Sequence, residues 1–311
     1  TLWGGERIIP YKELASGLSR VGESWELSGM PGSESVVAEG PWAGSTLSEL
    51  IGRFGAELLG KANYARFGQE FPLLVKFIDA REDLSIQVHP DDELARKRHG
   101  KSGKCEMWYV LEAEPGASLL TGFSRPIAPA EYERRVADNT LTDVLNRQAI
   151  ASGDVFYLPA GRVHSIGKGS FIVEIQQSSD ITYRIYDFDR RDAAGNSREL
   201  HTELAREAID FESSENSRIT YAPENNQEVR LVTTPYFTTS LYTLTARTRC
   251  DWSATDSFVA IVLLQGSGSL TDNEGNRIDV RQGETWLLPA STQWTEITPH
   301  TAPLRLLTSR I

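Results

Sequence analysis

Cysteine and long apolar runs are both scarce in this sequence. Among 311 residues only Cys105 and Cys250 are cysteines, and they lie far apart, outside any paired spacing. We therefore expect free thiols in a reducing compartment and no disulfide framework. The longest apolar run, Phe258 to Leu264, has the length of a strand and is far shorter than the ~18 residues of a membrane span. Because the first residues also lack the basic-then-apolar layout of a signal peptide, we expect a cytoplasmic protein.

Basic residues are also fewer than acidic residues. The chain has 32 Lys and Arg residues against 43 Asp and Glu, which gives a formal net charge of −11. Such a field repels nucleic acid and anionic membranes, so we expect neither as a partner. An anionic small molecule would need a local basic pocket that acts against the field of the whole chain. Apolar residues make up 40% and charged residues 24%, a globular composition that excludes wholesale disorder.

Strand-like patterns dominate the chain. Runs rich in β-branched and aromatic residues, punctuated by Gly and Pro, occupy 71–120, 154–185 and 229–311. Apolar residues spaced three and four apart predict helices at 46–59, 130–146 and 200–209. The charged segment 93–103 is expected to be a loop. These patterns predict a mainly β fold with inserted helices.

An internal repeat divides the chain into two domains. The segment from Gly153 to His164 matches that from Gly283 to Trp294, because glycine, an acid and Pro-Ala recur at the same offsets. We predict a first domain over residues 1–215, which carries the helices and any metal site, and a second, degenerate domain over 216–311. Trp294 stands where the first copy has His164, so we expect it to fill the apolar interior of a domain without metal ligands.

Five polar residues fall on strands in positions where their side chains can converge. Residues two apart in a strand point to the same side, so Gln87 and His89 share one face, and Lys104 and Glu106 share another. His164 follows a Pro-Ala-Gly turn. Two imidazoles, one carboxylate and one amide oxygen form a ligand set suited to zinc. Two imidazoles and a carboxylate also suit non-haem iron.

Each of these residues also has an ordinary structural explanation. A lone histidine on a β chain is more often structural than a ligand, and Lys104 could be a solvated loop lysine. Arg184 could form an ion pair with Asp187 or Asp189. The conjunction favours a site, because His89 and His164 alone among the five histidines fall in strand–turn frames with a polar partner on the same face. The other three, His99, His201 and His300, lie in polar segments and are expected in solvent.

The spacing around His164 resembles the second signature of the cupin superfamily. Gly153, Pro159, Gly161 and His164 match it, although the Asn usual four residues later is Lys168 here. Gln87-Val-His89, with Glu106 displaced by an insertion, resembles the first signature. Three further blocks, Leu84 to Asp92, Lys104 to Val110 and Glu174 to Asp187, are similar to type I mannose-6-phosphate isomerases. The resemblance covers roughly residues 3–190 strongly, and the chain looks like the short bacterial form.

This resemblance implies a fold, a metal and a reaction. The implied fold is two cupin-type jelly-roll β-barrels with inserted helices. The implied cofactor is one zinc ion per chain on Gln87, His89, Glu106 and His164. The implied reaction interconverts mannose 6-phosphate and fructose 6-phosphate through an enediol(ate), with Arg184 as an active-site residue.

The chemistry of the residues is compatible with that reaction. Lys104 and Arg184 could stabilise the oxyanion or bind phosphate, and they form the basic pocket that the net charge requires. Glu26 is a further candidate for substrate binding. The group that moves the proton stays open among Glu26, Lys104, His99 and a metal-bound water, with Lys104 or the water preferred.

Two other functional classes stay open at this point. One is another cupin metalloenzyme, such as an Fe(II) dioxygenase or an epimerase, and the other is a sugar-binding or regulatory cupin without turnover. Metal analysis together with an assay on mannose 6-phosphate distinguishes these classes. A small sugar phosphate is the expected partner, and we expect a monomer or weak homodimer.

Overall fold

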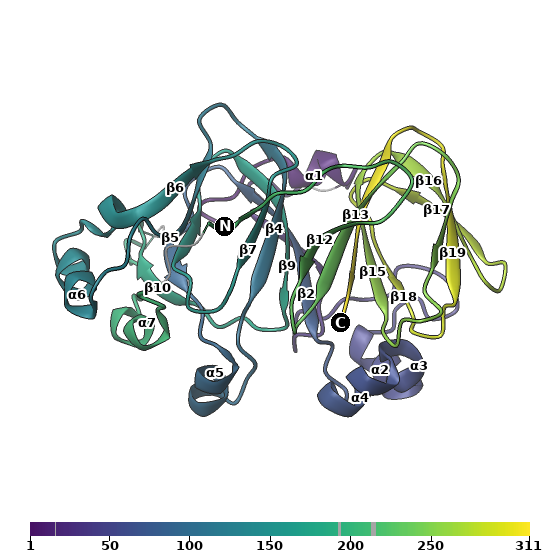
Figure 1. The fold of residues 1–311 in the computed structure, drawn as a ribbon, viewed down its shortest axis with the longest axis horizontal. Helices are drawn as coiled ribbons and strands as arrows, with labels where there is room; N and C mark the ends of the chain where they lie inside the picture. The colour runs from purple at the N-terminus through teal and green to yellow at the C-terminus, as the bar shows by residue number, and fades with distance from the viewer. Residues whose placement is uncertain (16, 192–193, 213–215) are drawn as a thin grey trace. The chain divides into compact units, whose positions relative to one another are not determined.

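The computed structural model describes residues 1–15, 17–191, 194–212 and 216–311, and strands predominate among them (Figure 1). The mainly β class predicted from the sequence is therefore confirmed. The helices are α1 Ile8–Tyr11, α2 Leu47–Phe54, α3 Ala56–Leu59, α4 Lys61–Phe67, α5 Asp92–His99, α6 Pro129–Ala137 and α7 Thr202–Ala208, with a 3₁₀ helix η1 at Leu141–Val144. None of the helices in these ranges has the length and apolar character needed to cross a bilayer.

The first eleven strands run to residue 219 and the other nine follow it. The first group is β1 Glu23–Leu27, β2 Leu73–Ala80, β3 Ile86–Val88, β4 Glu106–Ala113, β5 Ser118–Phe123, β6 Leu145–Ala149, β7 Val155–Leu158, β8 His164–Ile166, β9 Ser170–Gln177, β10 Tyr183–Tyr186 and β11 Arg218–Ile219. The second group is β12 Val229–Thr233, β13 Thr238–Leu244, β14 Thr248–Asp251, β15 Val259–Gln265, β16 Ser267–Asp272, β17 Arg277–Arg281, β18 Thr285–Leu288, β19 Trp294–Pro299 and β20 Leu304–Arg310.

The strands form two pairs of sheets with the same internal order. The first pair contains β2-β9-β4-β7 and β3-β8-β5-β6, and the second contains β13-β20-β15-β18 and β14-β19-β16-β17. Each strand of the second pair thus takes the place of the strand eleven positions earlier in the first, which is the repeat detected in the sequence. No sheet closes on itself within the described ranges, so we describe each pair as a two-sheet sandwich, and the two jelly-roll β-barrels expected from the sequence are not confirmed.

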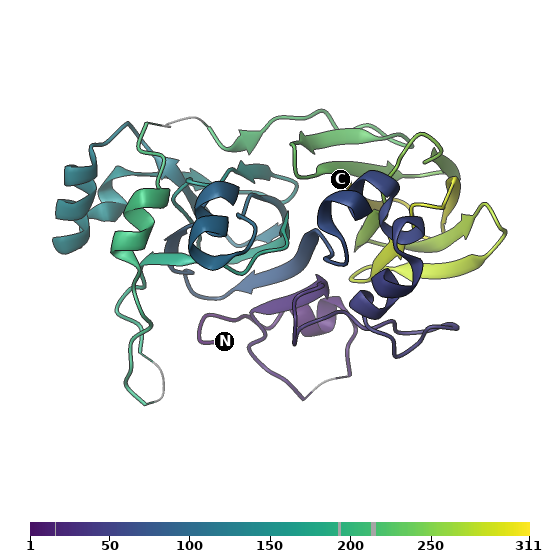
Figure 2. The same ribbon diagram turned by 90° about the horizontal axis from the view of Figure 1, so that it is seen from below.

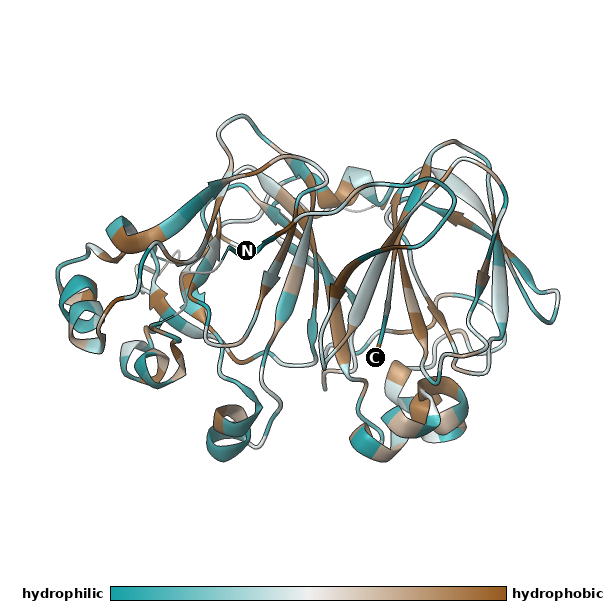
Figure 3. Ribbon diagram, in the orientation of Figure 1, coloured by the Kyte–Doolittle hydropathy of each residue, from teal (hydrophilic) through white to brown (hydrophobic). Residues whose placement is uncertain are grey.

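Apolar residues concentrate along the strands, whereas helix α5 is largely hydrophilic (Figure 3). In the first pair of sheets the interior includes Trp108, Phe156 and Ile172, all fully buried. Helices α5, α6 and α7 lie outside the two sheets of this unit in Figure 1, and Figure 2 shows α5 in front of one end of these sheets. The interior between the sheets is therefore left to side chains of the strands.

The chain forms two compact units whose limits differ from the expected domains. The first comprises residues 1–9, 16–24 and 76–219, and the second 10–15, 25–75 and 220–311. The boundary expected at 215/216 is near the observed 219/220, but the helical segment 25–75 belongs with the C-terminal part. Two contacts connect this segment to the C-terminal part. The Asp256 carboxylate accepts hydrogen bonds from the first two N–H groups of α4. Phe71 packs on Phe258, with ring centroids 4.8 Å apart.

The helix expected at 46–59 is present but interrupted. It begins as predicted, because Thr46 and Glu49 exchange side-chain and backbone hydrogen bonds in a capping box. Gly55, with φ of 48°, then breaks the helix into α2 and α3. A left-handed residue cannot continue the ladder of hydrogen bonds, and glycine adopts this conformation without strain.

Two other local expectations were wrong. The segment 130–146 is helical only to Ala137, because Asn139 has φ of 55° and the chain then turns into η1 and β6. The charged segment after Asp91 was expected to be a loop but contains helix α5. Asp91 caps that helix by accepting a hydrogen bond from Leu94 N at 2.8 Å, and Gly100 ends it in the left-handed conformation. The short helix expected at 200–209 is confirmed as α7.

Trp294 does not fill the interior of the second unit, contrary to expectation. Along β19 the fully buried residues are Thr295 and Ile297, so Trp294 points to the opposite face, where the Arg249 guanidinium lies 4.0 Å from its ring centroid. In β8, by contrast, His164 and Ile166 are the inward residues. A shift of one residue in a strand exchanges its two faces, so equal sequence offsets do not give equal orientations here.

The Asp256 cap predicts a stability effect. We expect Asp256→Ala to lower the free energy of unfolding by about 1 kcal/mol, because two N–H groups of α4 lose their acceptor, whereas Asp256→Asn retains most of the stability. The same hydrogen bonds lower the pKa of Asp256 below its usual 3.8, so the stabilisation is complete above that pH and declines as pH falls. Urea denaturation measures the effect, with the exposed Glu70→Ala as control. Equal stability of Asp256→Ala and the control would contradict it.

Candidate metal site in the first unit

Three of the sequence-predicted residues form one row across a sheet. Gln87 of β3 pairs with His164 of β8 on one side and with Arg184 of β10 on the other. Residues directly opposite each other in antiparallel strands present their side chains to the same face. Long-range pairing therefore brings together residues that are up to 97 positions apart in the sequence.

Glu106 reaches the same cluster from the other sheet. It begins β4, is fully buried, and places Oε1 3.1 Å from His164 Nε2 and Oε2 3.5 Å from His89 Nε2. One ligand atom from each of the three residues lies within 4.8 Å of the others. This buried triad could hold a metal ion, and its members are three of the four ligands expected from the sequence.

Both imidazoles are oriented by backbone carbonyl groups. His89 Nδ1 lies 2.8 Å from Ile181 O, and His164 Nδ1 lies 2.8 Å from Arg162 O. Each Nδ1–H donates to its carbonyl, which leaves the Nε2 lone pair directed at the cluster. Burial and the Lys104 ammonium lower the pKa of His89 to about 3, and burial lowers that of His164. Neutral imidazoles are the form that binds metal.

The surroundings of the Glu106 carboxylate give the strongest indication that this cluster can hold a cation. Both oxygens are buried, and neither accepts a hydrogen bond of good geometry from the described residues, although nitrogens approach to ion-pair distance. Burial alone would raise the pKa of Glu106, but Lys104 and the two imidazoles hold it well below the usual range. An ionised, buried carboxylate without donors is costly, and a bound cation removes that cost. The donor set therefore fits a metal.

Lys104 is part of this cluster rather than a solvated loop residue. Its Nζ lies 2.9 Å from Glu106 Oε2 and 3.1 Å from His89 Nε2, and the residue is 4% exposed. The same-face relation of Lys104 and Glu106 expected from the sequence thus brings an ammonium and a carboxylate into direct contact.

The sequence interpretation missed a second buried ion pair near the triad. Lys76 Nζ of β2 lies 3.1 Å from Glu174 Oε1 of β9, and Trp108 Nε1 donates to Glu174 Oε2 at 3.0 Å. The Trp108 ring meets His164 edge-on at 5.4 Å. A signal was present, since Lys76 and Glu174 are charged residues within otherwise apolar strand runs. Such residues are buried only when they are paired.

Arg184 is not held by the acidic neighbours that the sequence suggested. Asp187 instead pairs with Arg190 at 2.9 Å and with Arg198 at 2.7 Å. Arg184 donates from Nη1 to Glu199 O at 3.0 Å, and its buried Nε has no partner among the described residues. Burial, and after it the neighbouring Arg198, lower the pKa of Arg184.

Of the remaining candidate site residues, one lies at the triad and two do not. Gln87 lies at the triad, with Nε2 3.3 Å from His164 Nε2. Glu26 lies in the part of β1 that belongs to the second unit, where it pairs with Lys12, so the structure does not place it in the triad. His99 is hydrogen-bonded to Tyr183 OH at 2.7 Å and is not a member of the cluster.

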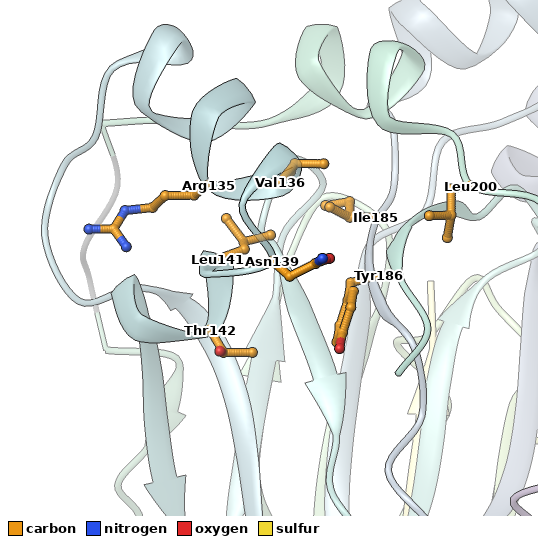
Figure 4. Close-up of a pocket in the computed structure, with 8 residues that line it drawn as sticks. All are labelled: Arg135, Val136, Asn139, Leu141, Thr142, Ile185, Tyr186 and Leu200. Atoms are coloured by element: carbon orange, nitrogen blue, oxygen red, sulfur yellow. The ribbon is translucent and has the colours of Figure 1, made fainter. Parts of the chain in front are cut away.

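A small hollow lies elsewhere in the first unit, between α6, η1 and β10 (Figure 4). Its volume is about 40 Å³, and its lining includes Asn139, Leu141 and Tyr186. This is room for a few water molecules, since one water needs ~10–15 Å³. The hollow is too small for a sugar phosphate, and none of its lining residues belongs to the triad.

The strand order and the triad together define a class of protein. Two sandwiches of equal strand order, one with a His–Glu–His cluster presented from strands, are typical of a cupin-like metal protein. The ligands come from β3, β4 and β8, so a metal at this site would bind to both sheets of one sandwich.

Comparison with known proteins identifies the family. The family model of the type I phosphomannose isomerase catalytic domain matches residues 11–120. The mannose-6-phosphate isomerase of Streptococcus mutans is 34% identical to this chain, and the match covers 93% of this chain and 89% of that protein. The mannose-6-phosphate isomerase ManA of Bacillus subtilis matches with the same identity and coverage. A crystal structure of the mannose 6-phosphate isomerase from Bacillus subtilis superposes with a TM-score of 0.89 at 30% identity, covering 100% of this chain and 96% of that one. The chain belongs to the type I phosphomannose isomerase family.

The triad predicts the effect of removing one ligand. We expect His164→Ala to weaken the binding of divalent metal by roughly tenfold or more, because Glu106 and His89 alone do not enclose the ion. Elemental analysis after dialysis measures the metal content of the variant and of His300→Ala, which removes an exposed histidine of the second unit. Full metal content in His164→Ala would exclude His164 as a ligand.

Proposed function

We propose that this protein is a zinc-dependent mannose-6-phosphate isomerase that acts through an enediol(ate) at the first-unit triad. The observation that carries the proposal is the buried Glu106 carboxylate, whose oxygens lie within 3.5 Å of the Nε2 atoms of two neutral imidazoles and 2.9 Å from the Lys104 ammonium. Family membership supplies the substrate class, because the relatives at 34% identity are named mannose-6-phosphate isomerases. We also interpret the two sandwiches as jelly rolls of the cupin type.

The ligand chemistry favours zinc. Two imidazoles and a carboxylate match the nitrogen and oxygen donors of zinc sites, whereas magnesium and calcium prefer oxygen alone. Gln87 is the proposed fourth ligand, and rotation of its amide brings the oxygen to the side where Nε2 now meets His164. A zinc ion bound there supplies a Lewis acid that polarises the carbonyl oxygen of the substrate.

Lys104 is the proposed proton-transfer group. The reaction removes the proton from C2 of the aldose and delivers a proton to C1, while the O2 hydroxyl proton moves to O1. Lys104 Nζ takes the C2 proton after it has released its own proton to solvent, and returns the C2 proton to C1. The ammonium paired with Glu106 is the form that carries the proton between the two steps. Its position beside Glu106 and His89, within 3.1 Å of both, keeps the amine close to the site where the carbonyl is polarised.

Arg184 is proposed to bind the anionic oxygens of the substrate. Arg184, Arg190 and Arg198 all lie close enough to Asp187 to lower the pKa of its carboxyl group, so three guanidinium groups gather in this part of a chain of net charge −11. Arg184 also shares a sheet face with Gln87 and His164. Its planar fork, incompletely paired in the structure, suits the bidentate binding of an enediolate or a phosphate.

Metal removal tests this function against the alternatives. We expect turnover of mannose 6-phosphate to fall to background after chelation, to return with zinc, and to stay low with magnesium, because imidazole ligands do not select magnesium. A coupled assay for fructose 6-phosphate measures turnover, and an oxygen electrode tests the iron-dependent class. Oxygen uptake with iron and no isomerisation with zinc would contradict the proposal, as would full turnover in chelator.

Arg184 provides a sharper test of mechanism. We expect Arg184→Lys to lower kcat at least tenfold, ~1.4 kcal/mol, because lysine keeps the charge but loses the two-pronged contact that strengthens in the transition state. Steady-state kinetics on zinc-loaded enzyme measure this, with Arg96→Lys on the exposed face of α5 as the matched control. A raised KM with unchanged kcat would instead make Arg184 a phosphate anchor.

A further inference from the structure

His201 binds both polar groups of the Arg184 backbone. The Arg184 backbone N–H donates to His201 Nδ1 at 3.2 Å, and the His201 backbone N–H donates to Arg184 O at 2.7 Å. The sequence placed His201 among the histidines expected in solvent, but only 24% of its side chain is exposed. The imidazole is therefore directed at the residue to which the proposed function assigns the anionic oxygens of the substrate.

Arg184 lies where the sheet offers its backbone little support. In the strand order β10-β3-β8-β5-β6, β10 is an end strand of the sheet. Arg184 lies opposite Gln87 of β3, and the register shifts directly after it, between Arg184 and Tyr186. An edge strand presents backbone groups that no neighbouring strand binds, and a register shift disrupts the ladder locally. His201 supplies the partners that a further strand would give, at the residue that carries the guanidinium group.

The segment before α7 also holds the Arg184 side chain. Arg184 Nη1 donates to Glu199 O at 3.0 Å, so residues 199 and 201 bind Arg184 at three points. Two of these points fix the backbone, and the third fixes the guanidinium group that extends from it. A carbonyl oxygen carries no net charge, so this contact orients the guanidinium group without neutralising it.

The hydrogen bond from Arg184 requires one tautomer of His201. A backbone N–H can only donate, so His201 Nδ1 is the acceptor and the ring proton lies on Nε2. Nε2 lies 3.9 Å from Oε2 of Glu199, and a carboxylate on that side favours the proton at that nitrogen. The ring also lies beside Tyr183, with ring centroids 6.4 Å apart. The imidazole is thus oriented as an acceptor for Arg184.

We propose that His201 is a positioning residue for the isomerase reaction, which holds Arg184 so that the guanidinium group meets the anionic oxygens of the substrate. The inference rests on the role proposed for Arg184, and His201 acts only through that residue. A guanidinium fork binds two oxygens at once only in a defined orientation. A small displacement of a group that positions the substrate lowers turnover by about tenfold or more.

A double-mutant cycle tests this role. His201→Phe keeps an aromatic ring but removes the acceptor, whereas His201→Asn keeps an acceptor close to the position of Nδ1. On zinc-loaded enzyme we expect His201→Phe to lower kcat about tenfold, and His201→Asn to retain most of the wild-type kcat. When the guanidinium group is already removed by Arg184→Ala, we expect His201→Phe to lower kcat no further, because residues that act as a unit are not additive.

The cycle separates positioning from a general effect on the fold. Zinc content and urea denaturation are measured for each variant. His300→Phe is the matched control, because it makes the same change at an exposed histidine of the second unit and should keep wild-type kinetics. If denaturation shows that His201→Phe is unfolded, His201→Ser takes its place, since serine favours a helix N-terminus and its side chain is too short to reach Arg184 N.

Amide hydrogen exchange reports the contact without any turnover. We expect the Arg184 amide to exchange about tenfold faster in His201→Phe, because its acceptor is lost, and at close to the wild-type rate in His201→Asn. NMR of the ¹⁵N-labelled full chain measures this exchange.

Four results would overturn the inference. These are wild-type kcat in His201→Phe, an equal loss of kcat in His201→Asn, an equal further loss when His201→Phe is added to Arg184→Ala, and unchanged exchange of the Arg184 amide. Failure of the proposed function gives a different pattern. Wild-type kinetics in Arg184→Ala would remove Arg184 from the reaction, and the positioning role of His201 would fall with it.

Discussion

The buried negative charge of the Glu106 carboxylate must be compensated, and the interior of the first unit is arranged around this requirement. Burial of an ionised group is costly unless cations compensate its charge. His89, His164 and Lys104 all lie within 3.5 Å of its oxygens, and the backbone carbonyls at Ile181 and Arg162 orient the two imidazoles. A chain with a large negative net charge therefore concentrates basic side chains in the interior of one sandwich, and we connect that concentration with binding of a metal and an anionic substrate.

The two sandwiches show how one strand order can serve different purposes. In the first, β3, β4 and β8 direct ligands into the space between the sheets, and the Lys76–Glu174 pair adds further buried charge. In the second, β14, β15 and β19 occupy the equivalent positions, but the interior is apolar and includes Trp252 and Ile261. Fold repetition in this protein therefore does not imply repetition of the site.

Local patterns predicted the elements whose signals are complete within a few residues. Apolar residues at helical spacing predicted the helix that begins with α2, and strand alternation predicted that Gln87 and His89 share one face. The predictions were wrong where a single backbone conformation ended an element. The positive φ of Asn139 follows the end of α6, although the apolar helical pattern of the sequence continues beyond it. Asp91 and Gly100 cap a helix in a segment whose charged composition suggested a loop. Composition is an average over a segment, whereas a cap acts at one residue.

The sequence by itself determined which chemical groups are available: two imidazoles, a carboxylate and an amide on strand faces, in spacings similar to those of one enzyme family. Tertiary structure alone decided their partners. It paired Asp187 with Arg190 and Arg198 rather than with Arg184, and it joined Lys76 to Glu174. It also turned Trp294 outward. The reason is that side-chain alternation is a local property, whereas the register of antiparallel strands depends on contacts between distant residues, and one residue of register exchanges inside and outside.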